Sequence, residues 1–446
     1  MGSVGKPGIE DLKATLSDSS IVITPDSSKY ESSIKRWASS AEKAASMIVF
    51  PASAADVSKA VLFSREAQLE LAIVCGGHAT SGSSSTDGGL CLDLSKMRVV
   101  TVDAEKKTAT VQGGALWADV DLELAKYELA TVGGTVNHTG VGGLTLGGGY
   151  GYLTGQYGLV IDNLLEVELV LADGSIVNAS ESQNPDLFWA ARGAGRNFGV
   201  ATSFTFQAYE QRKPVWAGLL VFPKEKLDEV ITAANQLYKL GGGRNWTTVG
   251  FGSFPPILRT SILVVAFFDG PEDEAKGLYE PLLNANPLVN TTGLMPYPSA
   301  NSMLNHAMPH GLRRGMKGSA FMAPLDTKFA ASIFKDVEDF VQKVPDAESS
   351  TILFEGVSFE KVIAVPQRAT SFTNRGAYGS VLIMPVWTDS KYDNDCREWM
   401  RAMATKCRAE FSLRKEKGTD EVTNEGVGEY VNYDGKFGFF NLPENC

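Results

Sequence analysis

The sequence predicts an α+β fold in two parts that divide near residue 211, and three observations predict it. The chain has 446 residues, enough for two or three compact units with a sizeable core. Short apolar runs alternate with amphipathic ones from residue 47 to residue 210, and longer apolar runs follow Pro214. The 43% hydrophobic and 21% charged residues are ordinary for a folded protein, which argues against disorder.

The first part is predicted to consist of short strands and helices joined by tight turns. Asp173-Gly174, between two apolar runs, predicts a β-hairpin. Asn184 followed by Pro185 predicts the N-cap and first position of a helix. The remaining elements of this part are strands near 47–50, 71–74, 90–94, 99–102 and 108–111, and helices near 56–66 and 117–127.

The second part is predicted to be one larger sheet with helices packed on it. Its apolar runs are long enough for strands of a single sheet, and the stretches between them have a helical period. The expected strands lie near 215–222, 247–254, 261–268, 351–358 and 380–387, and the expected helices near 224–240, 272–284, 328–343 and 391–410.

The net charge argues against some classes of binding partner, and the lack of a secretory signal indicates the compartment. The net charge of −11 repels phosphate backbones and anionic lipid, so neither nucleic acid nor a membrane is expected as a partner. The first residues contain no apolar run typical of a secretory signal, and no later stretch reaches membrane-spanning length. We therefore expect a cytoplasmic protein, whose five scattered cysteines are reduced thiols.

Glycine is the unusual component of the composition, at 45 of 446 residues. Clusters lie at 75–82, 133–134, 140–152 and 193–200. None has the G-x-G-x-x-G spacing of a dinucleotide fingerprint, and no phosphate-binding GxxxxGK[ST] loop is present. Glycines without these spacings can still turn successive backbone N–H groups toward a diphosphate. The clusters thus predict a nucleotide site of a different kind.

Three histidines are candidates for a cofactor contact or for metal ligands. In CGGHATSG a predicted strand leads into two glycines and then His78, so the backbone could lie flat against a cofactor; a surface turn with a hydrogen-bonded His78 fits the spacing as well. His306 and His310 have the i, i+4 spacing of helical metal ligands, but Pro309 lies between them and no third ligand is evident. We predict no metal site, and place both of these histidines in a loop or pocket wall.

Several motifs, in the same order, resemble the flavoenzymes related to berberine bridge enzyme, of the vanillyl-alcohol oxidase/p-cresol methylhydroxylase (PCMH) superfamily. They are GGHATSG, DGGLCLDLS, VGGLTLGGGYGYL, YGL-x-x-DN, NPDLFWAARGAGRNFGV and a late YVNY. The resemblance covers residues 40–215 closely and 345–446 more loosely. It implies a PCMH-type FAD-binding domain of two α/β subdomains over residues 1–210, with its core at about 40–212. A substrate domain with a large antiparallel sheet covered by helices would follow over 211–405, and a segment over 406–446 would return to the FAD domain.

The resemblance also implies how FAD is held. His78 matches the histidine that is bonded to the flavin 8α-methyl carbon, and Val136 stands where some relatives carry a second, cysteine tether, so a single covalent link is expected. Thr139 matches the position that helps to control oxygen access to the flavin. The other implied cofactor-binding residues are Gly76, Gly77, Ala79, Thr80, Ser81, Gly82, Gly142, Gly143, Gly149 and Val200.

Catalysis with FAD needs a base beside the flavin, because a substrate must lose a proton as its hydride leaves. In the relatives this base is a tyrosine or a carboxylate, often from the late motif, so the resemblance implies the candidates Tyr430, Asn432 and Tyr433. On an extended strand Tyr430 and Asn432 share one face and Tyr433 takes the other, so Tyr430 is the preferred base. A strand with both tyrosines packed is the alternative. A phenolate would need a nearby cation, for which the candidates are Lys361, Arg368, Arg375 and Lys436.

The sequence hypothesis is an FAD-linked oxidase of a small, apolar secondary metabolite, with the substrate and O₂ as partners and H₂O₂ as a product. Trp246, Phe251, Phe254, Phe268 and Met295 are candidates for an apolar cavity wall. Two alternatives stay open: an oxidative cyclase or pericyclase, and a flavin-binding protein without catalysis, since the chain ends 13 residues after Tyr433, where relatives continue further. The sequence fixes neither the substrate nor the oligomeric state.

Overall fold

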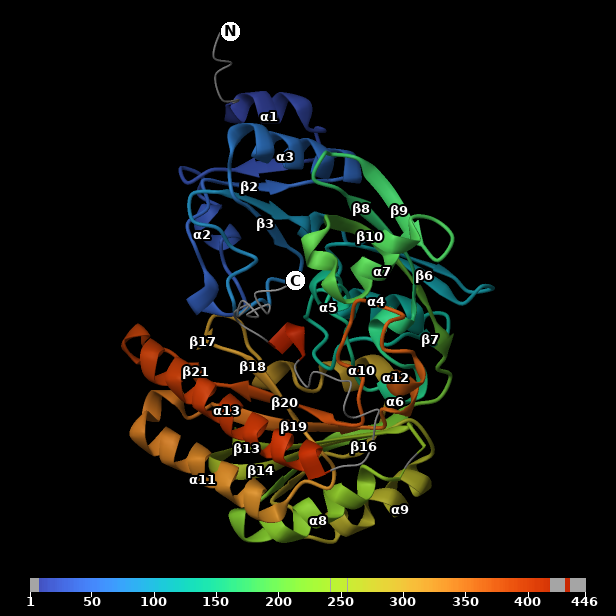
Figure 1. The fold of residues 1–446 in the computed structure, drawn as a ribbon, viewed down its shortest axis with the longest axis vertical. Helices are drawn as coiled ribbons and strands as arrows, with labels where there is room; N and C mark the ends of the chain where they lie inside the picture. The colour runs from blue at the N-terminus through green and yellow to red at the C-terminus, as the bar shows by residue number, and fades with distance from the viewer. Residues whose placement is uncertain (1–7, 241, 255, 418–429, 434–446) are drawn as a thin grey trace.

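The computed structural model describes residues 8–240, 242–254, 256–417 and 430–433, and its chain folds around three main sheets (Figure 1). The two smaller sheets occupy the upper half of the view and the largest sheet the lower half, with the helices α8, α9 and α11 beneath it. Strands and helices are mixed throughout, in agreement with the predicted α+β class.

The first sheet has four strands in the order β1-β2-β4-β3. Two of its three pairs are parallel, because β4 lies between β2 and β3 and runs with both, whereas β1 is antiparallel to β2. The loop that leaves β3 is the glycine-rich segment with His78. The elements of this region are α1 (Ile9–Thr15), β1 (Ile21–Ile23), α2 (Tyr30–Ser33), β2 (Met47–Phe50), α3 (Ala54–Ala67), β3 (Leu71–Val74) and β4 (Leu90–Asp93).

The second sheet is antiparallel, with five strands in the order β5-β6-β10-β8-β9. Helix α3 packs against both this sheet and the first, and Ser58 Oγ on that helix donates to the carbonyl of Gly174 at 2.6 Å. The strands are β5 (Val100–Asp103), β6 (Thr108–Gln112), β8 (Leu164–Val170), β9 (Ile176–Ser180) and β10 (Val200–Gln207). The helices are α4 (Trp117–Ala125), α5 (Val141–Thr145), α6 (Thr154–Tyr157) and α7 (Pro185–Ala194), and the short strands β7 (Leu129–Ala130) and β11 (Tyr209–Glu210) pair nearby.

The third sheet has eight strands and all its pairs are antiparallel. Its order is β15-β12-β14-β13-β19-β20-β18, with β16 also paired to β12. The strands are β12 (Val215–Phe222), β13 (Asn245–Phe254), β14 (Ile257–Phe268), β15 (Val289–Asn290), β16 (Gly293–Met295), β18 (Lys317–Phe321), β19 (Thr351–Val357) and β20 (Gly379–Met384). A further two-stranded pair joins β17 (Arg313–Arg314) to β21 (Val386–Trp387).

Alternation along these strands gives the third sheet two different faces. On β13, Phe251 packs against Phe334 of helix α11 with ring centroids 5.5 Å apart, whereas Trp246 and Thr248 line a cavity on the opposite face. Helix α11 (Thr327–Lys343) buries residues at helical spacing, and the side chain of Asp326 caps its first turn by accepting from the N–H of Phe329 at 2.7 Å. The other helices of this half are α8 (Leu227–Leu237), α9 (Glu272–Leu283), α10 (Tyr297–Ser302), α12 (Glu360–Ala364) and α13 (Asp393–Lys417).

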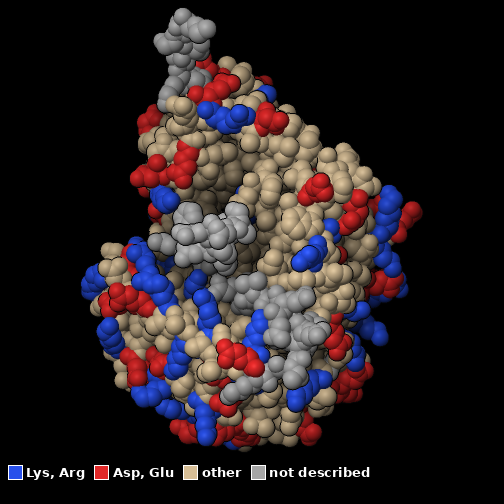
Figure 2. All heavy atoms as spheres, in the orientation of Figure 1, with Lys and Arg blue, Asp and Glu red and all other residues tan. Residues whose placement is uncertain are grey.

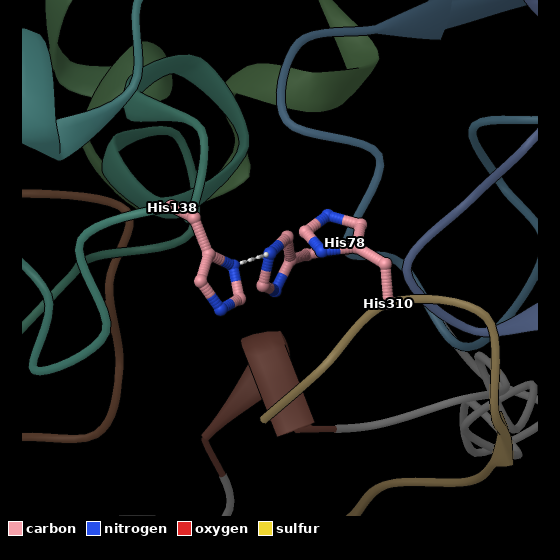
Figure 3. Close-up of side chains that lie close together, drawn as sticks. All are labelled: His78, His138 and His310. Atoms are coloured by element: carbon pink, nitrogen blue, oxygen red, sulfur yellow. Dashed lines mark hydrogen bonds between the residues drawn. The ribbon is translucent and has the colours of Figure 1, made fainter. Parts of the chain in front are cut away.

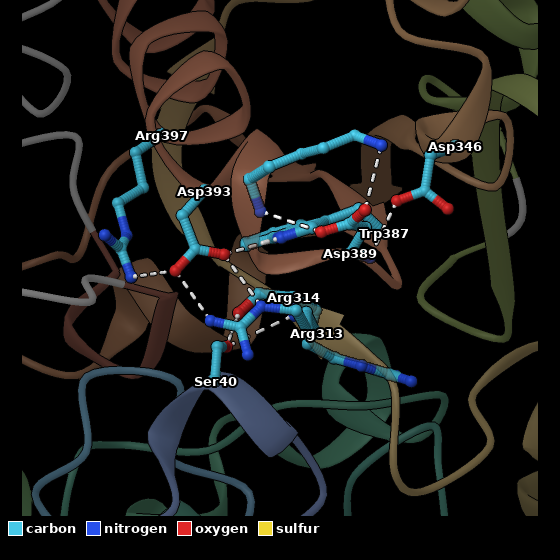
Figure 4. A network of polar contacts seen from close by, with 9 residues as sticks. Ser40, Arg313, Arg314, Asp346, Trp387, Asp389, Asp393 and Arg397 are labelled. Carbon is cyan, nitrogen blue, oxygen red and sulfur yellow. Dashed lines mark hydrogen bonds and ion pairs between the residues drawn. The ribbon is translucent and has the colours of Figure 1, made fainter.

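A polar network ties the segment around β17 to both halves of the molecule (Figure 4). The Arg313 guanidinium forms two hydrogen bonds of 2.7 and 2.6 Å to Asp393, at the start of α13. Trp387 Nε1 donates to the same carboxylate at 2.8 Å. On the other side, Ser40 Oγ donates to the carbonyl of Arg314 at 3.0 Å. The network thus fixes the loop before β17, which carries His310, between the two halves.

The expected elements are present, with two local differences. The hairpin at Asp173-Gly174 joins β8 to β9, and Gly174 has a positive φ of 83°. Pro185 starts α7, but the side chain of Asn184 does not cap it: it donates to the carbonyl of Asn178 at 2.7 Å instead. The expectation of a strand at YVNY is wrong, because Val431–Tyr433 form a short 3₁₀ helix, η9.

The division into domains stays a prediction. The second sheet and its flanking β11 end by residue 210 and the third sheet begins at residue 215, but α13 runs without interruption through residue 406. Cys75, Cys91, Cys396 and Cys407 are free thiols, as expected, and Cys446 lies outside the described residues. Across the part of the chain that the structure describes, no helix has the length and apolar character needed to cross a bilayer.

Candidate active site

A cavity of about 410 Å³ lies between the glycine-rich loops of the first half and the open face of the third sheet. In the space-filling view the molecule is hollowed between its upper and lower parts, and the side chains around the hollow are largely uncharged (Figure 2). Both the loop after β3 and the loop before α5 contribute lining residues, and strands β13, β19 and β20 supply the facing wall. The cavity therefore has one wall from each half of the chain.

Close backbone contact shapes the glycine wall. A Cβ on Gly76 would lie 2.3 Å from the nitrogen of Gly140, so neither loop could carry a side chain at that contact. Gly77 has a φ of +66°, which glycine adopts without strain. A Cβ on Gly143 would meet nothing within 4 Å, so the backbone there faces open space. This wall fits a flat cofactor with a diphosphate, as FAD is, because bare backbone can approach it closely.

The structure brings most of the expected cofactor-binding residues to this cavity. Two do not reach it: Gly82, where a Cβ would contact Lys43, and Gly149, whose N–H donates to the hydroxyl of Tyr430 at 3.1 Å. Those that line it are Gly76, Gly77, His78, Ala79, Thr80, Ser81, Thr139, Gly142, Gly143 and Val200.

His78, which lines the cavity, lies in a cluster of rings with His138 and His310 (Figure 3). Its ring stacks on Trp37 with centroids 4.6 Å apart and planes 9° apart. Its Nε2 lies 2.8 Å from Nδ1 of His138, and the two nitrogens share a hydrogen bond. Burial, together with repulsion from the neighbouring histidines and Arg314, holds the pKa of His78 well below its usual range. The ring is therefore neutral at neutral pH.

The histidine pairing differs from the one considered in the sequence. His306 is exposed in the 3₁₀ turn Asn305–Ala307, whereas His310 joins His78 and His138, with one ring nitrogen of each within 4.8 Å of the others. Nitrogen ligands about 2.0–2.1 Å from a tetrahedral zinc ion lie roughly 3.3 Å apart. The 2.8 Å between His78 and His138 is instead a hydrogen-bond distance, and we interpret the pair in that way.

A buried carboxyl lies in the opposite wall. Glu355, on β19, is 5% exposed and accepts hydrogen bonds from Tyr150 at 2.6 Å and from Tyr433 at 3.0 Å. Burial raises the pKa of Glu355 to about 7, and the two tyrosine hydroxyls only partly offset that rise. A carboxyl that is half ionised near neutral pH and open to a cavity is suited to accept a proton during a reaction.

The late motif lies in the same cavity, but its arrangement differs from the expected strand. Because residues 431–433 are helical, Tyr430, Asn432 and Tyr433 all line the cavity, and Tyr433 does not turn away. The hydroxyl oxygen of Tyr430 accepts from Gly149 N–H at 3.1 Å and from Asn432 Nδ2 at 2.6 Å. Burial raises the pKa of Tyr430 above its usual value in spite of these donors. It therefore stays protonated at neutral pH.

Among the described residues, Arg196 is a cation in contact with this motif, and it was not among the predicted candidates. Arg196 donates to Asn432 Oδ1 and, at 3.1 Å, to the carbonyl of Gly143, and its charge lowers the pKa of Tyr430. Of the candidates named, Arg375 is bound to Asp162 at 2.6 Å. Lys361 and Arg368 are exposed, and Lys436 lies outside the described residues.

The wall of the third sheet is largely apolar. Of the aromatic and methionine candidates Trp246, Phe251, Phe254, Phe268 and Met295, only Trp246 is among the lining residues. On each of two neighbouring strands, positions two apart line the cavity together: 353 and 355 on β19, and 382 and 384 on β20. The apolar residues that join Trp246 are Val265, Leu304, Met308, Met316, Leu353, Leu382 and Met384.

Sequence reasoning missed Glu355, Tyr150 and His138. A signal for Glu355 was present, since it is the one charged residue in the apolar run 351–358, where an unpaired charge is costly and calls for a reason. Tyr150 lies inside the motif VGGLTLGGGYGYL, and His138 lies between the expected cofactor positions Val136 and Thr139; nothing in their spacing shows which residues they contact.

Comparison with known proteins identifies the family. Residues 45–180 match the family described as FAD binding domain. The FAD-linked oxidoreductase pgmH of Aspergillus terreus is 32% identical over 421 residues, which span 92% of this chain and 84% of that protein.

Solved structures agree over almost the whole chain. The 6-hydroxy-D-nicotine oxidase of Arthrobacter nicotinovorans superposes with a TM-score of 0.79 at 25% identity, covering 94% of this chain and 90% of that one. The BBE-like 1 protein of Physcomitrella patens has the same fold, with a TM-score of 0.80 at 20% identity, covering 95% and 90%. Sequence and fold together show that the chain belongs to the berberine bridge enzyme-like family of FAD-linked oxidoreductases, with a PCMH-type FAD-binding fold.

Proposed function

We propose that this protein is an FAD-dependent oxidase that takes a hydride from a small, largely apolar molecule and reduces O₂ to H₂O₂. The reacting group is an alcohol, an amine or an activated C–H bond, and the setting is the modification of secondary metabolites. The observation that carries the proposal is the buried Glu355, whose pKa is about 7 and which is hydrogen-bonded by two tyrosines in a cavity opposite the glycine wall.

FAD, when bound along the glycine wall, supplies the hydride acceptor. The chain supplies the proton acceptor. Tyr433 Oη takes the O–H or N–H proton of the substrate while its own proton passes to Glu355, 3.0 Å away. Tyr150 donates to the same carboxylate and holds it in place. We assign Tyr430 and Asn432 to positioning, because Tyr430 is held by donors from Asn432 and Gly149.

The apolar wall supports a substrate with few polar groups. Methionine and leucine side chains from strands β19 and β20 and from segments outside the sheet line the same cavity as Glu355, and an apolar lining of this kind disfavours water at the proton acceptor. A polyhydroxylated substrate would leave its hydroxyls without partners against such a wall, which costs binding free energy. A substrate with a single alcohol or amine group at Tyr433 would avoid this cost, because that group would have a hydrogen-bond partner.

His78 is proposed to form the one covalent link to FAD. It lies in the cavity wall with a neutral ring, which is the nucleophilic form of histidine. Val136, at the place of a second tether, lines the cavity without a thiol. Thr139, a small residue in the same wall, is compatible with access of O₂.

Two experiments test the proposal. Acid precipitation of the purified protein should leave a yellow pellet with a flavin-bearing peptide that contains His78, and a colourless pellet from flavin-loaded protein would refute the tether. Anaerobic mixing with apolar alcohols and amines should bleach the flavin, and readmitted air should give H₂O₂ in proportion to product. A cyclised product without that peroxide would instead support the cyclase, and resistance to every such substrate a flavin-binding protein without catalysis.

A further inference from the structure

A hydrogen bond places His138 beside His78, the residue proposed to bond covalently to FAD. Reversible binding of FAD does not require this hydrogen bond. The hydrogen bond between His78 Nε2 and His138 Nδ1 is 2.8 Å long and joins the loop after β3 to the loop before α5 (Figure 3). Trp37 fixes the plane of the His78 ring by stacking on it. The stacking on Trp37 thus fixes the plane of the His78 ring, and the hydrogen bond to His138 fixes how the ring is rotated in that plane.

Attachment of a histidine to a carbon demands a particular tautomer. The attacking nitrogen must present a lone pair, so the single proton of the neutral ring must sit on the other nitrogen. When His138 Nδ1 accepts the hydrogen bond, that proton is on Nε2 of His78 and the lone pair is on Nδ1. The reverse arrangement, with His138 as donor, would engage the lone pair of Nε2 and leave Nδ1 protonated, so neither nitrogen could attack.

We propose that His138 is a positioning residue for the covalent attachment of FAD, accepting the Nε2 proton of His78 so that Nδ1 of His78 bonds to the flavin. The inference rests on the single His78 tether proposed above. It makes His138 the proton acceptor of the attachment reaction, and it predicts which of the two nitrogens carries the flavin.

The reaction balances with dioxygen as the oxidant. Attachment replaces one C–H bond of the flavin 8α-methyl group and the N–H bond of His78 with one C–N bond. Two protons and two electrons are released, and the electrons reduce the flavin ring. Dioxygen takes up the electrons and the protons to give H₂O₂. His138 receives the proton of His78 and passes it to water that enters the cavity.

The surroundings keep both rings neutral, as this role requires. Burial and repulsion from His310 lower the pKa of His138 to about 4, so its Nδ1 has a free lone pair at neutral pH. The buried Arg314 guanidinium, 4.0 Å over the Trp37 ring, lowers the pKa of all three histidines by repulsion. His310 approaches His78 only edge-on, with ring centroids 5.9 Å apart.

Substitution of His138 tests the proposal with a readout that is independent of turnover. Flavin-poor protein is prepared from riboflavin-limited cells and mixed with FAD in air, and covalent flavin is followed by acid precipitation and intact mass. His138→Phe should slow attachment at least about tenfold. His138→Gln should slow it less, because its amide oxygen can accept the hydrogen bond from the Nε2–H of His78. His306→Ala removes a histidine that is exposed and lies outside the cluster; it is the control, and its rate should stay within about twofold of the wild type. Quenching of FAD fluorescence measures reversible binding separately.

Unmodified protein provides a second measurement that does not depend on how the variants fold. Digestion of the wild-type protein to its flavin-bearing histidine should give the Nδ1-linked isomer. An Nε2 link, or a wild-type rate of attachment in His138→Phe, would overturn the role of His138 and leave the tether intact. Absence of covalent flavin from the wild-type protein would overturn the tether itself and this inference with it.

Discussion

Replacing Glu355 with glutamine keeps the size of the side chain and removes its ability to accept a proton. Glu355 is buried among apolar cavity residues, with two tyrosine hydroxyls as its partners. Glutamine can accept from one of them through its amide oxygen, so we expect E355Q to fold. If Glu355 takes the substrate proton through Tyr433, flavin reduction in E355Q should slow by a factor of about 10² to 10⁴.

The magnitude of the accompanying stability change follows from the pKa. The pKa of Glu355 rises from 4.5 to about 7 on folding. At roughly 1.36 kcal/mol per pH unit, the ionised carboxylate is therefore about 3 kcal/mol less favourable in the folded protein than in the unfolded chain. A raised carboxyl pKa gives stability that is complete below pH 4.5 and is lost as the pH rises through about 7. E355Q should not show this loss. Its free energy of unfolding relative to the wild type should therefore be greater at about pH 9 than at about pH 5, by up to about 3 kcal/mol.

Anaerobic stopped-flow reduction across pH, paired with urea titrations at the same pH values, measures both effects. Wild-type reduction should rise with pH through about 7 as Glu355 ionises, and E355Q should be slow throughout. Equal reduction rates in the two proteins, or a wild-type rate that does not change between mildly acidic and mildly alkaline pH, would refute Glu355 as the proton acceptor. The stability measurement would still report whether the carboxyl is buried as described.

Three further predictions follow from the cavity and its walls. Tyr433→Phe should slow flavin reduction about 10²-fold because it breaks the path to the carboxylate, and Tyr430→Phe should slow it less; the reverse order in stopped flow would return Tyr430 to the role of base. Gly76→Ala should lower the flavin content of the purified protein, since its Cβ would meet backbone at 2.3 Å, whereas Gly277→Ala, with open space around its Cβ, should not. Asp121 is buried, and burial raises its pKa from 3.8 to about 7; Asp121→Asn should therefore reduce the loss of stability that urea titrations show as the pH rises from about 4 through about 7, and an unchanged pH profile would contradict this.

The fold was predictable to the extent that its elements depend on local pattern. The strands of the third sheet have long apolar runs, and the helices on it repeat their buried residues at helical spacing, so both could be read from the sequence. The short 3₁₀ helix at Val431–Tyr433 could not. Alternating Tyr, Val, Asn and Tyr has the pattern of a strand, and what sets its shape is docking against the cavity, where Asn432 and Tyr430 find partners more than 200 residues away.

The site was predictable only where the motifs of a known family fall on it. Those motifs placed His78 and the glycine loops at the cavity, and the structure brings them there. The pairing of His138 with His78, and of Tyr150 with Glu355, joins residues 60 and 205 positions apart. Such contacts depend on how the two halves of the chain pack, and no local period or spacing encodes them.

The carboxylate of Glu355 accepts hydrogen bonds from two hydroxyls that are far apart in the sequence, those of Tyr150 and Tyr433. The environment of this proton acceptor therefore depends on three separate segments, which carry Tyr150, Glu355 and Tyr433. Until these three segments pack together, Glu355 is an ordinary exposed carboxyl with an ordinary affinity for protons. The raised pKa of Glu355 is thus a property of the assembled cavity and of no single segment.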